Sequence, residues 1–295
     1  SQINSPALRN MTTPQSHYVL CCERELHVEV WNPAVSGTLV LWHGLTRTGR
    51  DFRTLAIHFS PHYRLLIPNT LGRDHSQWAQ DPMTEYTVPF YMKQAVALLE
   101  HFQVKRCGWI GTSMGGIMGM LLRATSLQKR LAGLVINDIG PELPIGAIQR
   151  ITNYVSRPPT FNNFQELKQY FQQVYQPFGW LSDQEWQELA ISSARRKDDG
   201  RWTVHYDVRL SEPFAQAPQG GDLWKIYEQI CCPVMILRGE FSDILTPSVA
   251  EQMTTRGPMG RLFTLPNCGH APYLNTPEQI DLLKKFLQEI FRQAS

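Results

Sequence analysis

The sequence predicts an α/β fold with a mostly parallel sheet and helices on both of its faces. Short runs of β-branched and apolar residues alternate with longer stretches of helical periodicity along most of the chain. Repeated strand-then-helix units give parallel strands, because each helix carries the chain back across the sheet. The chain has 295 residues, 42% of them hydrophobic and 18% charged, which is enough apolar material for a large core.

The expected strands are short and rich in Val, Ile and Leu, as strands buried between layers are. In chain order they span residues 17–22, 25–31, 37–43, 63–69, 106–112, 130–138, 232–239 and 261–266. The clearest helices are expected at 86–102, 114–123 and 277–291. In the last of these, Ile280, Leu283, Leu287 and Ile290 recur at steps of three and four residues, which predicts one apolar stripe facing the sheet.

The strand signal fades between residues 140 and about 230, where amphipathic helices are predicted at 164–175 and 182–194. We interpret 140–230 as a helical lid inserted into the core. Its many aromatic residues pack a small core of their own, line an apolar substrate pocket, or do both. The predicted organisation is an N-terminal tail, the first part of the core, the lid, and the second part of the core, at 1–16, 17–139, 140–230 and 231–295.

Charge and cysteine content narrow the class of partner. The 28 basic and 26 acidic side chains leave a formal net charge of +2, so neither nucleic acid nor a membrane is the expected partner, and a small-molecule substrate is. The six cysteines form no CxxC pair, which favours reduced thiols and a cytoplasmic protein. No apolar segment is long enough to span a bilayer. The oligomeric state stays open.

The motif that carries chemistry is Gly111-Thr112-Ser113-Met114-Gly115, a GxSxG between a predicted strand and a predicted helix. A serine at such a sharp turn exposes its hydroxyl, and the flanking glycines leave room for the neighbouring backbone. The following helix directs its N-terminal amides at negative charge that develops beside the serine. We interpret Ser113 as a nucleophile; the alternative is a structural glycine-serine turn.

A serine nucleophile needs a base and an acid that orients the base. His270 follows the strand at 261–266, and Asp243 follows the strand at 232–239, so both lie where parallel sheets place functional groups. The order serine, aspartate, histidine along the chain is the order that accompanies a GxSxG turn between a strand and a helix. Two other acids remain open: Asp138, which ends the strand at 130–138 and otherwise pins the hinge of the lid, and Glu240.

With these residues the chain resembles the α/β-hydrolase superfamily, in particular its lid-bearing bacterial serine hydrolases. The resemblance runs from about residue 17 to residue 291 and includes the segments GTSMGG, VINDIGPE, LRGEFSD and GHAPYLNTPEQI. It implies an eight-stranded sheet with the lid inserted after strand 6. His43-Gly44-Leu45 resembles the family's HGx loop, which implies an oxyanion hole made by the backbone amides of Leu45 and Met114. Residues 69–76 depart from the family's D-x-R-G-x-G-x-S pattern, since only Gly72 and Ser76 fit.

The resulting hypothesis is a serine hydrolase, without cofactor or metal, that cleaves a carboxylic ester of a small and largely apolar substrate through an acyl-enzyme. On the same groups, hydrolysis of a carbon-carbon bond in a diketone and lactone hydrolysis are alternatives. Carbon-carbon hydrolases often carry tryptophan after the histidine, whereas this chain has Ala271. A serine at position 113 argues against dehalogenases and epoxide hydrolases, which use aspartate. A receptor that kept the fold without turnover is the non-enzymatic alternative.

Overall fold

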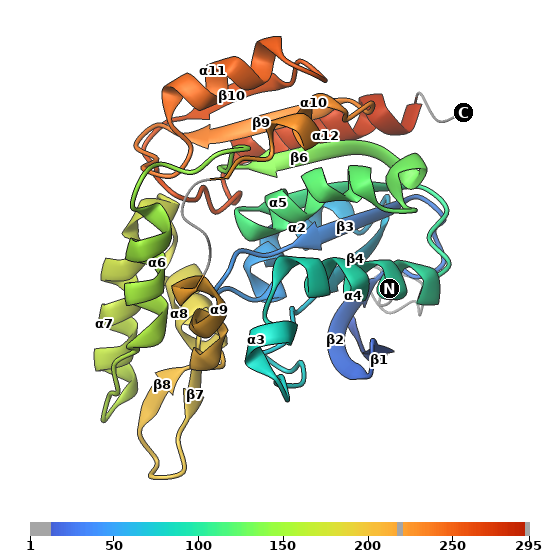
Figure 1. Ribbon diagram of the computed structural model, residues 1–295. Coiled ribbons are helices and arrows are strands. Elements are labelled where there is room, and N and C mark those ends of the chain that lie inside the picture. The colour runs from blue at the N-terminus through green and yellow to red at the C-terminus, as the bar shows by residue number, and fades with distance from the viewer. Residues whose placement is uncertain (1–12, 217–220, 293–295) are drawn as a thin grey trace.

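The protein was analysed as a computed structural model, which describes residues 13–216 and 221–292 (Figure 1). Residues 1–12, most of the expected N-terminal tail, lie outside the described residues. The core is an eight-stranded sheet with the order β1-β2-β4-β3-β5-β6-β9-β10. All neighbouring strands from β4 to β10 in this order run parallel to each other, and the antiparallel pairs of this sheet are β1 with β2 and β2 with β4. The prediction of a mostly parallel eight-stranded sheet is confirmed.

The strands lie close to their expected positions, and the parallel ones end at a common edge of the sheet, where the site lies. They are β1 (Gln15–Cys21), β2 (Arg24–Trp31), β3 (Thr38–Trp42), β4 (Arg64–Pro68), β5 (Cys107–Thr112), β6 (Leu131–Asn137), β9 (Val234–Gly239) and β10 (Arg261–Leu265). Since β3, β5, β6, β9 and β10 run parallel, the loops that leave their carboxyl ends meet at one edge of the sheet.

Helices cover both faces of the sheet, each face with its own apolar core. One face carries α2 (Arg53–Phe59) and α12 (Pro277–Arg292), and the other carries α4 (Val88–His101), α5 (Met114–Leu121), α10 (Trp224–Glu228) and α11 (Pro247–Thr255). The predicted apolar stripe of α12 is buried against the sheet. None of the helices among the described residues combines the length and the apolar character needed to cross a bilayer.

Between β6 and β9 the chain forms the inserted segment (residues 140–230), most of which stands beyond the end of the sheet at the left of Figure 1, whereas its last helix, α10, lies against the sheet. It contains α6 (Ala147–Ser156), α7 (Phe164–Val174), α8 (Asp183–Ser192), α9 (Glu212–Ala215) and, at its end, α10, through which the chain returns to the core. It also contains the antiparallel hairpin β7 (Ala194–Arg196) and β8 (Trp202–Val204), which the purely helical expectation missed. Strands of three residues are too short to produce a readable alternation.

Short helices complete the secondary structure. They are α3 (Pro82–Glu85) and the 3₁₀ helices η2 (Gly49–Phe52), η3 (Leu122–Ala124), η4 (Gln128–Arg130), η5 (Gln176–Phe178) and η6 (Val208–Ser211). The η2 helix follows the loop after β3, and η5 belongs to the inserted segment; both lie beside the site described below.

Buried polar contacts fix the inserted segment to the core. His205 accepts a hydrogen bond from the Asp74 amide at Nδ1 (3.1 Å) and donates from Nε2 to the Thr46 carbonyl (2.7 Å). Tyr86 donates its hydroxyl to the Asp207 carboxylate at 2.6 Å. Burial holds the pKa of His205 well below its ordinary value, which keeps the ring in the neutral form with one donor and one acceptor. The atypical 69–76 loop thus serves as an anchoring point for the inserted segment.

Candidate active site

Ser113 lies between β5 and α5 in a strained conformation, with φ of 52° and ψ of −111°. A non-glycine residue in this region costs about 1–3 kcal/mol and is held there by its surroundings. A Cβ at Gly111 would overlap the Gly115 carbonyl, and one at Gly115 would overlap the Trp42 carbonyl. The two glycines therefore allow β5, the turn and α5 to approach closely enough to force the serine into this sharp turn.

Three side chains form a hydrogen-bonded row at the carboxyl edge of the sheet. The Ser113 hydroxyl lies 2.9 Å from Nε2 of His270, and Nδ1 of His270 lies 2.6 Å from Oδ2 of Asp138. A neutral ring that donates from Nδ1 to the carboxylate has an acceptor lone pair at Nε2 facing the hydroxyl. This is the arrangement in which an imidazole is able to take the proton of a serine.

The structure corrects the expected acid. The sequence favours Asp243, but Asp138, at the end of β6, is the carboxylate that binds His270. In the loop after β9, Ser242 turns inward and is buried, whereas Asp243 is exposed and forms no hydrogen bond with His270. Glu240 is exposed as well.

Asp138 is completely buried, and its hydrogen bonds hold it in place. Its Oδ1 accepts from the Gly239 amide at 2.7 Å, and its Oδ2 accepts from the Ser242 hydroxyl at 2.6 Å in addition to His270. With φ of 61°, Asp138 turns sharply out of β6 toward the neighbouring strand β9. The loop after β9 therefore supports the carboxylate that binds His270 and does not supply it.

The peptide between Gly44 and Leu45 is held from one side. The Gly44 carbonyl accepts from Nδ1 of His43 at 2.6 Å and from the Arg47 amide at 3.1 Å. In a trans peptide the N–H points opposite to the carbonyl, so the Leu45 amide is directed away from these two donors. A Cβ on Gly44 would lie 3.7 Å from Cβ of Ser113, so this loop adjoins the serine.

Arg73 holds the loop after β3 that contains Leu45, and no sequence motif predicts this role. Its side chain is fully buried, and its Nε donates to the Leu45 carbonyl at 2.8 Å. Its Nη1 donates to the Leu71 carbonyl and to the Tyr91 hydroxyl, at 2.7 and 2.8 Å. The residue sits in the loop that departs from the family pattern, so sequence comparison with that pattern gave it no role.

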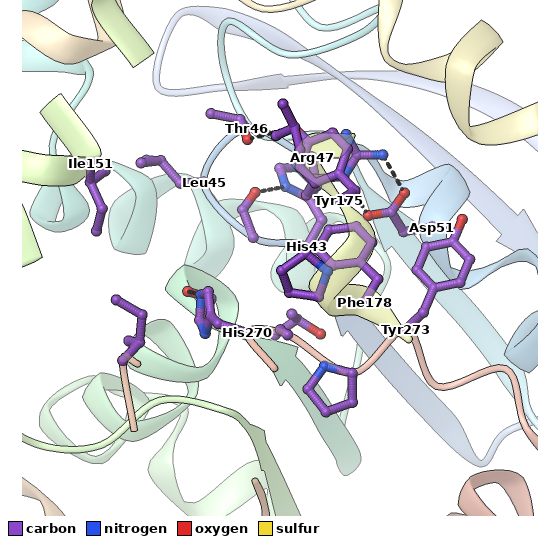
Figure 2. A pocket seen from close by; sticks show the side chains of 18 of the residues that line it. His43, Leu45, Thr46, Arg47, Asp51, Ile151, Tyr175, Phe178, His270 and Tyr273 are labelled. Atoms are coloured by element: carbon purple, nitrogen blue, oxygen red, sulfur yellow. Dashed lines mark hydrogen bonds and ion pairs between the residues drawn. The ribbon is translucent and has the colours of Figure 1, made fainter. Parts of the chain in front are cut away.

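A cavity of about 350 Å³ opens between the core and the inserted segment, and both Ser113 and His270 line it. Figure 2 shows that the aromatic rings of Tyr175, Phe178 and Tyr273 gather on one side, with Ile151 on the other. Most of the lining is apolar, and the volume is that of a small-ligand site. Aromatic residues of the inserted segment, such as Tyr175 and Phe178, thus pack in its core and also line the cavity. Both interpretations of these residues therefore apply.

An ion pair lies in the aromatic wall of the cavity. Arg47 is buried and donates twice to the Asp51 carboxylate, both times at 2.8 Å, and once to the Ser193 hydroxyl at 2.9 Å. Its guanidinium lies 4.4 Å from the centre of the Tyr175 ring. Burial opposes the charge, but the Asp51 carboxylate outweighs it and raises the pKa of Arg47. The two charges therefore neutralise each other within the protein, and no sequence motif indicates this ion pair.

The structure offers no metal centre among residues 13–216 and 221–292, because no three His, Cys, Asp or Glu side chains there gather as ligands. The six cysteines are free thiols, and burial raises the pKa of Cys268, two residues from His270, to about 11. A thiol with a raised pKa is a poor nucleophile at neutral pH. Burial therefore leaves Cys268 without the lowered pKa that activates a nucleophilic thiol.

Comparison with known proteins identifies the family. A family model for the alpha/beta hydrolase fold matches residues 37–277, which include the serine turn and the histidine loop. The chain belongs to the α/β-hydrolase family. A solved α/β hydrolase from Novosphingobium aromaticivorans has a TM-score of 0.84 at 32% identity, and the match covers 93% of this chain and 98% of that one.

Two curated relatives of this α/β hydrolase have named activities. A 3-hydroxybutyrate-oligomer hydrolase of Cupriavidus necator is 36% identical over 288 residues, covering 93% of this chain and 98% of that protein. A pimeloyl-[acyl-carrier protein] methyl ester esterase of Xanthomonas campestris is 23% identical, covering 84% and 94%. The chain is therefore an enzyme of the hydrolase class, and its relatives support ester hydrolysis.

Proposed function

We propose that this α/β hydrolase is a serine esterase in which Ser113 is the nucleophile, His270 the base and Asp138 the acid. The observation that carries the proposal is the row of two hydrogen bonds, 2.9 and 2.6 Å long, that joins these side chains in the wall of an apolar cavity. Both distances are those of hydrogen bonds, and with the ring proton on Nδ1 of His270 the donor-acceptor sense is the one that acyl transfer requires.

In the proposed reaction the Ser113 oxygen attacks the ester carbonyl, and its proton moves to Nε2 of His270. The backbone amides of Leu45 and Met114 donate to the oxyanion; Met114 begins α5, where the first amides have no partner within the helix. His270 then protonates the leaving alcohol, which leaves an acyl group on Ser113. Water attacks this acyl-enzyme with His270 again as base, releasing the acid and restoring the serine.

The proposed substrates are short oligoesters of hydroxy acids such as 3-hydroxybutyrate. The Cupriavidus necator relative, named for such an oligomer, supports this class, since the two chains align over nearly their whole lengths. Such an oligomer links the carboxyl of one unit to the hydroxyl of the next through a carboxylic ester. The apolar cavity of about 350 Å³ suits units with short methyl-bearing chains.

The experiment compares the parent with Ser113→Ala on p-nitrophenyl butyrate and on the dimer and trimer of 3-hydroxybutyrate. We expect kcat to fall by about a million-fold in Ser113→Ala, because loss of the nucleophile removes the acyl-enzyme route. The matched control is Ser126→Ala, at an exposed serine that follows α5 and does not line the cavity, which should keep the parent rate. A fluorophosphonate probe should label the parent and the control but not Ser113→Ala. Turnover by Ser113→Ala at the parent rate would refute the proposal.

A further inference from the structure

A second arginine lines the cavity in a very different environment from Arg47. Arg150 lies on α6, exposed at the inserted segment's side of the cavity, beside Ile151 and Tyr154. Among the described residues its guanidinium has no hydrogen-bond or ion-pair partner, and a Cβ added to Gly146 would lie 3.7 Å from its Nη1. Arg150 is thus a positive charge at the cavity that has no counter-charge among residues 13–216 and 221–292.

The contrast with Arg47 indicates which of the two arginines is available to a ligand. Arg47 makes two hydrogen bonds to Asp51 and one to Ser193, so a substrate carboxylate would compete with an existing ion pair for the guanidinium. Arg150 offers all of its side-chain donors at no such cost. A guanidinium binds a carboxylate through two parallel hydrogen bonds, a geometry that an uncharged ester end cannot match.

We propose that Arg150 binds a free carboxylate of the substrate, so that the enzyme prefers esters that carry an anionic end over their neutral counterparts. The inference rests on the proposed esterase function and specifies its substrate class. A linear oligoester of a hydroxy acid carries one such carboxylate, at the end opposite its free hydroxyl. Arg150 is then the residue that distinguishes the free oligomer from its esterified form.

Asp243 is the opposing charge at the same cavity. It is exposed, lines the cavity and has no hydrogen-bond or ion-pair partner in the part of the chain that the structure describes. The two side chains do not form an ion pair with each other. A substrate whose carboxylate is repelled by Asp243 and attracted by Arg150 has one favoured orientation, with its anionic end toward α6.

The test uses the dimer and the trimer of 3-hydroxybutyrate as free acids and as their methyl esters, with the parent and with Arg150→Gln and Arg150→Glu. In Arg150→Gln we expect KM for the free acids to rise roughly three- to ten-fold, as suits a partly exposed charge pair. KM for the methyl esters and kcat for both forms should stay near the parent values. Arg150→Glu should raise KM for the free acids further, and added salt should raise this KM in the parent but not in Arg150→Gln.

The matched control is Arg157→Gln, at an exposed arginine that caps the carboxyl end of the same helix and does not line the cavity. It should retain the parent's ratio of KM for free acid and methyl ester. An equal ratio in the parent and in both Arg150 variants would overturn the assignment of Arg150 while leaving the esterase intact. Failure of the parent to cleave p-nitrophenyl butyrate or any oligomer would instead refute the esterase function.

Discussion

Two neighbouring loops at the carboxyl edge of the sheet each present an aspartate, and the structure uses them in opposite ways. The loop after β6 buries Asp138 completely and gives its carboxylate three hydrogen bonds. The loop after β9, one strand further along the sheet, leaves Asp243 exposed and without a partner among the described residues. Both positions satisfy the order serine, aspartate, histidine, so the order alone does not choose between them.

The difference shows that the environment of a carboxylate selects the acid. A buried charge is tolerated only when its lone pairs are satisfied, and Asp138 meets this condition through Gly239, Ser242 and His270. Such a carboxylate is fixed in position and loses little freedom when His270 becomes charged. An exposed carboxylate is solvated by water and exerts a weaker effect on a neighbouring ring.

The largest expected effect separates these two aspartates directly. In Asp138→Asn we expect kcat to fall by about 10,000-fold, because the amide no longer holds the ring in the useful tautomer or stabilises its charged form. Asp243→Asn should change kcat for a neutral ester by less than about two-fold, as expected for an exposed group without partners. Steady-state kinetics on p-nitrophenyl butyrate measures both, with circular dichroism to verify folding. The reverse ranking would return the acid to the loop after β9.

A smaller effect tests whether the loop after β9 supports the acid. Ser242 donates to the same oxygen of Asp138 that accepts from His270, and its own oxygen accepts from the Leu245 amide at 3.1 Å. In Ser242→Ala we expect kcat to fall about ten-fold with KM unchanged, as one hydrogen bond to a charged group implies. A purely structural role would lower the melting temperature without this separation of kcat from KM. The matched control is Ser248→Ala, an exposed serine on α11, which should affect neither.

Much of the candidate site at the carboxyl edge of the sheet can be predicted from the sequence. The GxSxG turn predicts Ser113 because its signal is local: a strand, two flanking glycines and a helix lie within residues 107–121. The alternation of strands and helices likewise predicts the sheet, and the histidine follows from its place after the last strand. These features depend on near neighbours in the chain, or on a repeated pattern, and both are visible without coordinates.

The remaining features depend on contacts between distant segments. The choice of Asp138 rests on its pairing with a loop about 100 residues further on, and a single sequence carries no record of such pairings. The supporting roles of Arg73 and His205 depend on contacts of the 69–76 loop with the loop after β3 and with the inserted segment, and the sequence alone does not indicate these contacts. Three-residue strands such as β7 and β8 lie below the length at which alternation is detectable.

The comparison of buried and exposed groups extends to His43, which directly follows β3 at the same edge and is, like Asp138, almost completely buried. Its Nδ1 donates to the Gly44 carbonyl, and its Nε2 accepts from the Thr70 amide at 2.9 Å, so a second proton on the ring would face an N–H donor. Burial, with a further contribution from the positive charge of Arg73, lowers the pKa of His43 to about 3.

The smallest expected effect is on stability and follows from that lowered pKa. An unfolded chain binds a proton at this histidine below its ordinary pKa of about 6.5, whereas the folded chain does not until about pH 3. The free energy of unfolding is therefore retained above pH 6.5 and falls as the pH drops, by up to ~1.4 kcal/mol per pH unit from this group. Urea unfolding between pH 7 and 4 measures the slope. In His43→Gln the slope should decrease by up to this amount, and an unchanged slope would mean that the buried ring takes up its proton as readily as one in water.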